Sequence, residues 1–564
     1  MNKFQYILLG LTAVAGVSCA DLDYNEASSR DEEWTYNSPI NGVKNLVYDV
    51  YAQMPSEFKD DLYGQGAMIA SASDEAEFAL SYSSIHNYYN GGWTASNPFS
   101  NTWTVSYRAI AQVHMYLERI DKIDLSEYEY APDYENMVQQ FEIFPYELRF
   151  LRAYYYFELV RAYGDVPLVT TTLTNAQANT VERAAAADVF KFIVDECDAV
   201  AQYLPVSYND IPGQEIGRAT RGAALALKAR ALLYQASPLF NKDNDKELWK
   251  QAAAASKFII DNASIWGYSL SPYANLWGHD TFTNPEFIFV LGTTADNTFE
   301  KNNYPVGVEN GNSGNCPTQS LVDMYEYQAD GKTFKEKHPG TVNVTTENPY
   351  DGLDPRFELT VVKNGDLWPS NTNQQLVMET FQGGFNGAPK YGATPTGYYL
   401  KKFVDGSCIT TTNNPTTTRH NWIVMRLAEV YLNYAEAMYN YYGDADNAGE
   451  FGMSANQAIN VLRNRADIMM PEFSGSADFE QRYMRERMVE LAFEGHRFWD
   501  VRRWKKGAEF FSNVDVADLT KDASGNLILN RATKARKWDD KYYLYPIPQS
   551  ERQKNGNLTQ NTGW

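Results

Sequence analysis

Apolar residues recur at helical spacing in several stretches of the chain. Between Leu148 and Leu159 they follow one another at steps of 3, 4 and 4 residues, which places them on one face of a helix. Comparable steps join Leu225, Ala229, Leu232 and Ala236, then Leu427, Val430, Tyr434, Ala437 and Tyr441, and finally Met484, Met488 and Leu491. The pattern predicts four helices, each with one buried face.

Small residues stand in the middle of three of these stretches. Ala153, Ala229 and Ala435 would let a neighbouring helix approach closely. Closely packed helix pairs that repeat along a chain form a solenoid. The sequence therefore predicts a mostly α-helical scaffold resembling tetratricopeptide repeats, although it lacks a strict repeat of about 34 residues.

The amino-acid composition of the chain changes between about Gly267 and Arg419. This stretch is rich in Asn, Gly, Pro and Thr, and it holds short strand-like runs at Phe287–Val290 and Leu359–Val362. We expect a single domain over residues 39–564, with helical parts at 39–266 and 420–564 and a loop-rich insert at 267–419. Loops held by a rigid scaffold often carry binding residues, so the insert is a candidate location for a site.

The N-terminal segment has the features of an export signal. Lys3 precedes a nearly uncharged apolar run from Phe4 to Val17, which is too short to span a membrane. The residues ending at Cys19 resemble a lipobox, so we expect a signal peptide at 1–18, a lipid on Cys19 and a polar tether at 19–38. The alternative is an ordinary secretory signal in which Cys19 is incidental. The protein should be anchored to a membrane without crossing it.

Charge and cysteine content exclude several classes of function. The formal net charge of −22 disfavours nucleic acid, which binds basic surfaces. Four widely spaced cysteines suit neither a disulfide framework nor a zinc site. Aromatic residues make up 14% of the chain, including 40 tyrosines and 12 tryptophans, so many rings should lie at the surface.

The sequence lacks the common catalytic motifs. It contains no His-Glu-x-x-His, no Gly-x-Ser-x-Gly and no phosphate-binding Gly-x-x-x-x-Gly-Lys, and its six histidines are scattered. A glycosidase needs only two suitably spaced carboxylates, so motifs alone leave that class open. Asp444–Gly449 begins like a calcium loop, but Ala448 and Ala455 replace two ligands, which favours a solvated turn. We expect no metal ion and no cofactor.

Seven sequence blocks resemble, in order, those of the SusD/RagB family. They are 147–169 (ELRFLRAYYYFELVRAYGDVPLV), 218–238 (RATRGAALALKARALLYQASP), 317–325 (PTQSLVDMY), 354–357 (DPRF), 426–437 (RLAEVYLNYAEA), 490–504 (ELAFEGHRFWDVRRW) and 545–548 (YPIP), the last followed by a terminal NTGW. The blocks span nearly the whole mature chain.

This resemblance implies a mostly α-helical protein with repeat-like helix pairs that binds a glycan and is not an enzyme. It also implies a cell-surface location at the outer membrane, a lipid anchor at Cys19 and a SusC-like TonB-dependent barrel as partner. Two alternatives stay open: a surface adhesin with no transporter, and a peptide-capturing relative. Charged residues of the blocks, such as Glu147, Arg149, Glu494 and Asp500, are expected to form structural ion pairs rather than a catalytic cluster.

A sugar site needs flat aromatic rings beside groups that bond hydroxyls. The stretch from Asp74 to Trp103 offers both, and Cys316 follows a loop rich in Asn and Gly. The predicted glycan-binding residues are Asp74, Tyr88, Tyr89, Trp93, Trp103 and Cys316.

Overall fold

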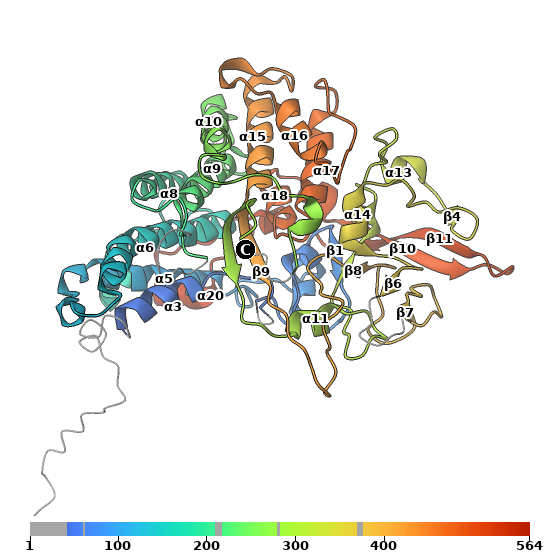
Figure 1. The fold of residues 1–564 in the computed structure, drawn as a ribbon, viewed down its shortest axis with the longest axis horizontal. Helices are drawn as coiled ribbons and strands as arrows, with labels where there is room; N and C mark the ends of the chain where they lie inside the picture. Colours follow the sequence, from blue (N-terminus) through green and yellow to red (C-terminus); the bar gives the residue numbers. More distant parts are fainter. Residues whose placement is uncertain (1–41, 60–61, 209–216, 279–282, 369–375) are drawn as a thin grey trace, which may run out of the picture.

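The computed structural model describes residues 42–59, 62–208, 217–278, 283–368 and 376–564 (Figure 1). Its main helices are α3 (Lys44–Ala52), α5 (Thr102–Leu117), α6 (Tyr134–Tyr163), α8 (Ala186–Ala201), α9 (Arg221–Ala236), α10 (Lys246–Asn262), α15 (Leu427–Tyr442), α16 (Ala455–Arg463), α17 (Phe479–Glu490) and α18 (Arg497–Arg503). The predicted signal peptide, Cys19 and the tether lie outside the described residues. Among the described helices, none is both long and apolar enough to cross a membrane.

The helices form the repeat-like scaffold that the sequence predicts. Helices α6, α8, α9, α10, α15 and α16 pack in succession and follow one another in an arc (Figure 1). The alanines of α9 explain the close packing, because Ala223, Ala224, Ala229 and Ala231 expose no surface. The fold is thus a mostly helical, tetratricopeptide-like solenoid, as predicted.

All four predicted helices are present, as α6, α9, α15 and α17. Of the predicted strands, Phe287–Val290 is confirmed within β2 (Phe287–Gly292). The strand predicted at Leu359–Val362 is wrong in its first half. Leu359 and Thr360 end the short helix α14 (Pro355–Thr360), where Asp354 caps the first turn and Pro355 occupies N1, and only Val361–Val362 form β5.

The strands pair in small antiparallel sheets. They are β1 (Ala76–Phe78) with β3 (Asn315–Pro317), β2 with β9 (Asn421–Arg426), β5 with β8 (Tyr399–Leu400), β6 (Leu367–Trp368) with β7 (Leu376–Val377), and β10 (Asn513–Lys521) with β11 (Leu527–Ala535), which also pairs with β4 (Val342–Asn343). The β2–β9 pair ties the insert to the scaffold, since β9 leads directly into α15. The insert is therefore attached to the helical scaffold through this strand pair.

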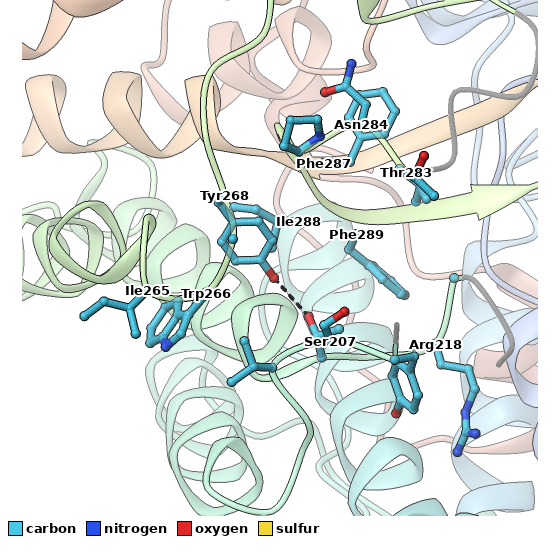
Figure 2. Close-up of a pocket in the computed structure, with 17 residues that line it drawn as sticks. Ser207, Arg218, Ile265, Trp266, Tyr268, Thr283, Asn284, Phe287, Ile288 and Phe289 are labelled. Atoms are coloured by element: carbon cyan, nitrogen blue, oxygen red, sulfur yellow. Dashed lines mark hydrogen bonds between the residues drawn. The ribbon is translucent and has the colours of Figure 1, made fainter. Parts of the chain in front are cut away.

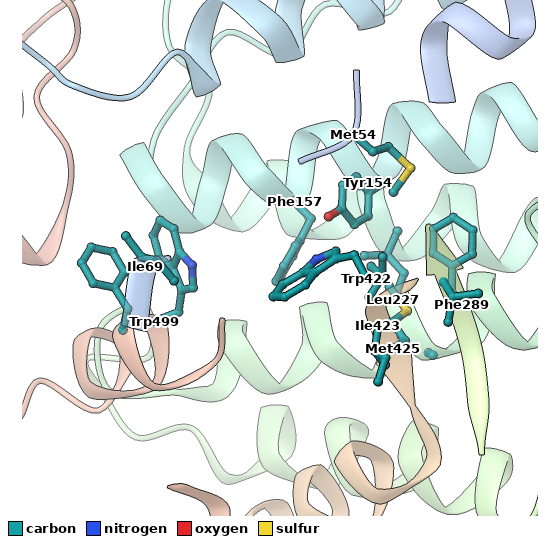
Figure 3. Packing of buried hydrophobic residues seen from close by; sticks show 14 of the residues in the cluster. Met54, Ile69, Tyr154, Phe157, Leu227, Phe289, Trp422, Ile423, Met425 and Trp499 are labelled. Carbon is teal, nitrogen blue, oxygen red and sulfur yellow. The ribbon is translucent and has the colours of Figure 1, made fainter. Parts of the chain in front are cut away.

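The largest hydrophobic cluster runs from Val43 to Leu558 and includes residues of both helical parts and of the insert. Figure 3 shows part of it, where Trp422 and Met425 of β9 lie near Tyr154 and Phe157 of α6. Burial of these rings removes a large apolar area from water, and this is the main stabilising contribution of the core.

A buried ionic network crosses the same core. Arg426 of β9 bonds Glu286 at 2.8 Å and Glu490 at 2.7 Å, and it also bonds Glu494. Glu147 of α6 pairs with Arg218, while Arg149 pairs with Glu196 of α8. The expectation of structural ion pairs is confirmed for these residues, and the pairs join separate elements of the fold.

Candidate functional site

Strands β1 and β3 bring together the two regions in which the sequence predicts a sugar site. Glu77 lies opposite Cys316 in the antiparallel register, and the Ala79 amide donates to the Gly314 carbonyl at 2.9 Å. The stretch after Asp74 and the loop before Cys316 are therefore neighbours in space. The specific residues predicted for that site require a correction.

The predicted aromatic platform is buried. Trp93 is 1% exposed, and Tyr88 and Trp103 are also buried. The Trp93 ring is enclosed by Tyr88, Tyr542, Tyr545 and Trp564, with ring centroids 4.7–5.5 Å away. A ring covered on these sides cannot stack on a sugar. The expectation for Tyr88, Trp93 and Trp103 is wrong in this structure because they fill the core.

Asp74, Tyr89 and Cys316 are also committed to internal contacts. Asp74 is 2% exposed, and Arg497 occupies both of its carboxylate oxygens at 2.8 and 2.7 Å. The hydroxyl of half-buried Tyr89 donates to Glu77, and the Arg536 guanidinium lies 4.0 Å from its ring centre. Cys316 is fully buried, and burial raises the pKa of its thiol to about 12. None of the three presents a free group to a ligand.

Three other aromatic residues are exposed near the β1–β3 junction. Tyr82 is 60% exposed, Phe385 49% and Tyr391 77%. Tyr82 follows β1 directly, and the other two lie in the glycine-rich stretch 383–392 of the insert. We call Tyr82, Phe385 and Tyr391 the aromatic platform.

These segments lie close to one another. A Cβ added at Gly392 would come within 3.9 Å of Leu80 Cδ2, so the chain beside Tyr391 lies near the chain before Tyr82. Gly307, at φ +97°, lies against the Phe385 ring, where a Cβ would come within 2.8 Å of Cε1. Asn386 Nδ2 donates to the Val306 carbonyl at 2.7 Å, which fixes the Phe385 loop on the loop 304–313.

The loop 304–313 also borders a polar groove of about 640 Å³. Its lining includes Asn310, Asn312, Thr410, Thr411, Thr412 and Thr417. Asn310 Nδ2 donates to the Thr410 carbonyl at 2.7 Å, and the Thr410 hydroxyl donates to the Glu309 carbonyl at 2.7 Å. These bonds hold the loop 304–313 against the segment around Thr410, which forms the other wall of the groove. The polar groove and the aromatic platform thus share one loop.

Sequence reasoning singled out two segments of this candidate region but did not name its exposed rings. Phe385 and Tyr391 stand in the run GGFNGAPKYG, where closely spaced glycines leave little apolar material to cover a ring. This composition was the feature of the sequence that could have predicted exposed rings here. Trp93 has a similar Gly-Gly neighbour, and only the fold shows that distant aromatic residues cover it.

A second pocket, of about 520 Å³, lies where the start of α9 and the end of α10 meet β2 (Figure 2). Trp266 and Tyr268 line it but are each only 9% exposed, and the Tyr268 hydroxyl lies 3.3 Å from that of Thr220. Arg218, also in its wall, is paired with Glu147. This pocket offers no exposed ring to a ligand.

Nothing in the described part of the chain resembles a metal centre, since it has no group of three or more His, Cys, Asp or Glu side chains placed to hold an ion. In the loop Asp444–Gly449, the Asp446 carboxylate accepts from Asn456 Nδ2 and from the Gly475 amide. Both of its oxygens therefore have donors from the protein, as expected for a turn.

Two family models match the chain. One, described as the SusD family, covers residues 285–564, and the other, described as starch-binding and associating with the outer membrane, covers residues 22–233. Together they account for most of the sequence. The chain belongs to the SusD/RagB family.

Individual SusD/RagB members show the same relationship over nearly full length. A SusD-like protein of Formosa agariphila, P2, is 23% identical over 99% of this chain and 98% of its own. A SusD-like protein of Bacteroides fragilis has a solved structure with a TM-score of 0.77 at 25% identity, covering 95% of this chain and 98% of that one. A second structure from that organism, described as a SusD-like carbohydrate-binding protein, gives a TM-score of 0.71 at 25% identity over 93% and 100%.

Proposed function

We propose that this protein is a cell-surface lipoprotein that captures oligosaccharides and delivers them to a SusC-like TonB-dependent transporter. The observation that carries the proposal is the aromatic platform of Tyr82, Phe385 and Tyr391 beside the polar groove. A pyranose has apolar C–H faces and a rim of hydroxyls, so it stacks on a flat ring while amides and hydroxyls bond its edge. The platform and the groove supply these two kinds of contact.

The family adds support for a carbohydrate ligand. One model that matches the chain is described as starch-binding, and one of the similar structures is that of a carbohydrate-binding protein. The site itself fits this chemistry better than it fits a peptide, because an extended peptide is held through strand edges or deep apolar pockets. The rings of Tyr82, Phe385 and Tyr391 are exposed, and the groove is lined mostly by polar residues.

We propose binding without hydrolysis. The charged residues of the family blocks, which could pass for a catalytic set, are buried in ion pairs. Glu490 and Glu494 both bond Arg426, and Asp500 bonds Arg487 at 2.7 Å. A polymer cannot reach these carboxylates. New reducing ends appearing in a mixture of purified protein and bound glycan, and abolished by one Asp or Glu substitution, would overturn this part of the proposal.

The anchor and the partner complete the proposal. A lipid on Cys19 would keep the protein at the outer membrane, and the tether 19–38 would hold it near one barrel at high effective concentration. The protein could then open and close over the barrel without leaving it. Co-purification of a barrel with a tagged copy from solubilised membranes supports this arrangement, and a tagged copy that brings down no barrel contradicts it.

The test of the site compares exposed aromatic residues. We expect Tyr391→Ala and Tyr82→Ala each to weaken binding of the glycan ligand roughly thirtyfold, since loss of a stacked ring at the centre of a site typically costs about 2 kcal/mol. Tyr130→Ala is the matched control, because Tyr130 is 94% exposed and precedes α6, which lies on the other side of the molecule from β6 and β7 of the insert (Figure 1). Calorimetry measures affinity, and circular dichroism confirms folding.

Equal affinity of the platform variants and Tyr130→Ala would show that the site lies elsewhere. Trp93→Ala is unsuitable as a probe, because removing a core ring costs about 3–5 kcal/mol of stability whatever its role in binding.

A further inference from the structure

The charges around the platform and the groove carry information about the ligand. Of the eleven residues that line the polar groove, Asp296 and Lys301 are the only charged ones, and most of the others are Asn or Thr. A site for acidic sugars would need cationic groups, above all the arginine fork that matches a carboxylate or sulfate. No arginine lines this groove.

Three arginines in or between the family blocks are occupied in the core. Arg426, Arg356 and Arg463 are buried and bonded to carboxylates. They cannot turn outward to meet an anion without leaving those carboxylates unpaired in the core, which would be strongly destabilising.

Lys390, on the same loop as Phe385 and Tyr391, is also engaged. Lys390 Nζ lies 4.0 Å from the centre of the Phe385 ring and donates to the Phe385 carbonyl at 3.0 Å. On the same loop, the exposed Glu379 accepts from the Phe385 amide, so a negative charge stands beside the positive one. Exposed Glu309 adds a second negative charge next to the groove. With Asp296 and Lys301 of the groove and the exposed Arg419, two residues after Thr417, these charges balance, so the surroundings hold no excess of cations.

The net charge of the whole molecule also acts on a charged ligand. With a net charge of −22, the protein repels polyanions, and the repulsion is reduced but not abolished at physiological salt, where the screening length is about 8 Å. An acidic polysaccharide carries charges along its whole length, so each further unit near the surface adds to the repulsion.

We infer that the site takes an uncharged glycan chain and discriminates against uronate-containing or sulfated polysaccharides. This inference rests on the proposed function and narrows its ligand class. Neutral amides and hydroxyls bond sugar hydroxyls without charge, while the net negative charge of the molecule disfavours anionic competitors.

The experiment uses one glycan in two charge states. The full-length mature protein is screened against neutral polysaccharides, and the one that binds is then oxidised at its primary hydroxyls to give carboxylates on the same backbone. We expect the oxidised form to bind at least about tenfold more weakly at about 0.05 M salt and to recover part of that loss at about 0.5 M salt. Affinity for the neutral form should change little with salt.

A charge variant separates the electrostatic cause from altered shape. Glu309→Gln together with Glu379→Gln should narrow the difference between the two forms and leave affinity for the neutral form within about twofold. Equal or tighter binding of the oxidised form, or a screen in which only acidic polysaccharides bind, overturns the inference and leaves the proposed function intact. A screen in which no glycan of either class binds overturns both.

Discussion

Glu57 is a buried carboxyl that has no ion-pair partner among the described residues. Its Oε2 accepts the Ile69 amide at 2.9 Å, and it borders a cavity of about 60 Å³. Besides four tyrosines (Tyr63, Tyr154, Tyr234 and Tyr545), the charged and titratable groups around that cavity are Glu158, Arg161, Arg230, Glu494 and His496. Arg161 pairs with Glu158, Arg230 with Glu429, and Glu494 with Arg426 and Lys402. Desolvation therefore dominates, and it raises the pKa of Glu57 to about 8.

This raised pKa gives a testable pH dependence. Glu57 holds its proton in the folded state above the pH at which it loses it when unfolded. Its contribution to stability is thus complete below about pH 4.5 and is lost as pH rises towards about 8. We expect Glu57→Gln to remove this decline, which is on the order of 5 kcal/mol at most.

Urea unfolding at about pH 5, 7 and 9 measures the effect. Glu142→Gln, at an exposed position of α6, is the control and should follow the wild type. If the wild type and Glu57→Gln lose stability in parallel between pH 5 and 9, Glu57 is not the group responsible.

Single residues also mark the limit of prediction from sequence. Trp93 follows a Gly-Gly pair, and Tyr391 stands in a glycine-rich run. Their local sequences are thus similar, yet Trp93 is buried and Tyr391 is exposed. The difference comes from Tyr542, Tyr545 and Trp564, more than 400 residues along the chain from Trp93. Nothing local in the sequence encodes that contact.

At the scale of elements, prediction was more successful. The helical spacing of apolar residues predicted α6, α9, α15 and α17 correctly. Each of these helices buries one continuous face, and such a face produces a periodic pattern in the local sequence. The β1–β3 pair, which joins residues about 240 positions apart, has no such local signal. The neighbourhood of the candidate site therefore needed the fold, even though both of its segments had been singled out.

The ion pairs that join β9 to α17 should be a main source of rigidity. Burial alone would raise the pKa of Glu490, but Arg465, Arg426 and Arg356 hold it well below its usual value. We expect Glu490→Gln to lower the free energy of unfolding by roughly 3–5 kcal/mol, because three buried guanidinium groups lose a shared carboxylate.

Glu450→Gln serves as the control for this variant. Glu450 bonds Lys250 at 2.9 Å at the surface, and an exposed pair contributes less than about 1 kcal/mol. Denaturant titrations compare the two variants with the wild type. A similar small loss in both would show that the buried network does not stabilise the fold.

At the scale of the whole molecule, the solenoid places the insert at one side of a rigid frame, and the remaining question is what holds that frame at the membrane. No described helix could span a bilayer, whereas Cys19 follows an apolar segment that starts with Lys3 and precedes the acidic residues Asp21 and Asp23. One lipid chain alone binds a membrane only weakly, so stable anchoring needs several chains or a second contact. A barrel partner would provide such a contact, which is why the anchor and the partner must be tested separately.

We therefore expect Cys19→Ala to have different effects in two strains. In cells that lack the barrel partner, the variant should leave the outer-membrane fraction and appear as folded, soluble protein, because it has lost its attachment. In cells that contain the barrel, part of the variant should stay with the membrane through the protein contact alone. Fractionation, with circular dichroism of the released protein, measures both outcomes. Membrane retention of Cys19→Ala in the strain without the barrel would contradict lipidation at Cys19, whereas loss of unaltered protein from those membranes would show that the barrel, not a lipid, holds it there.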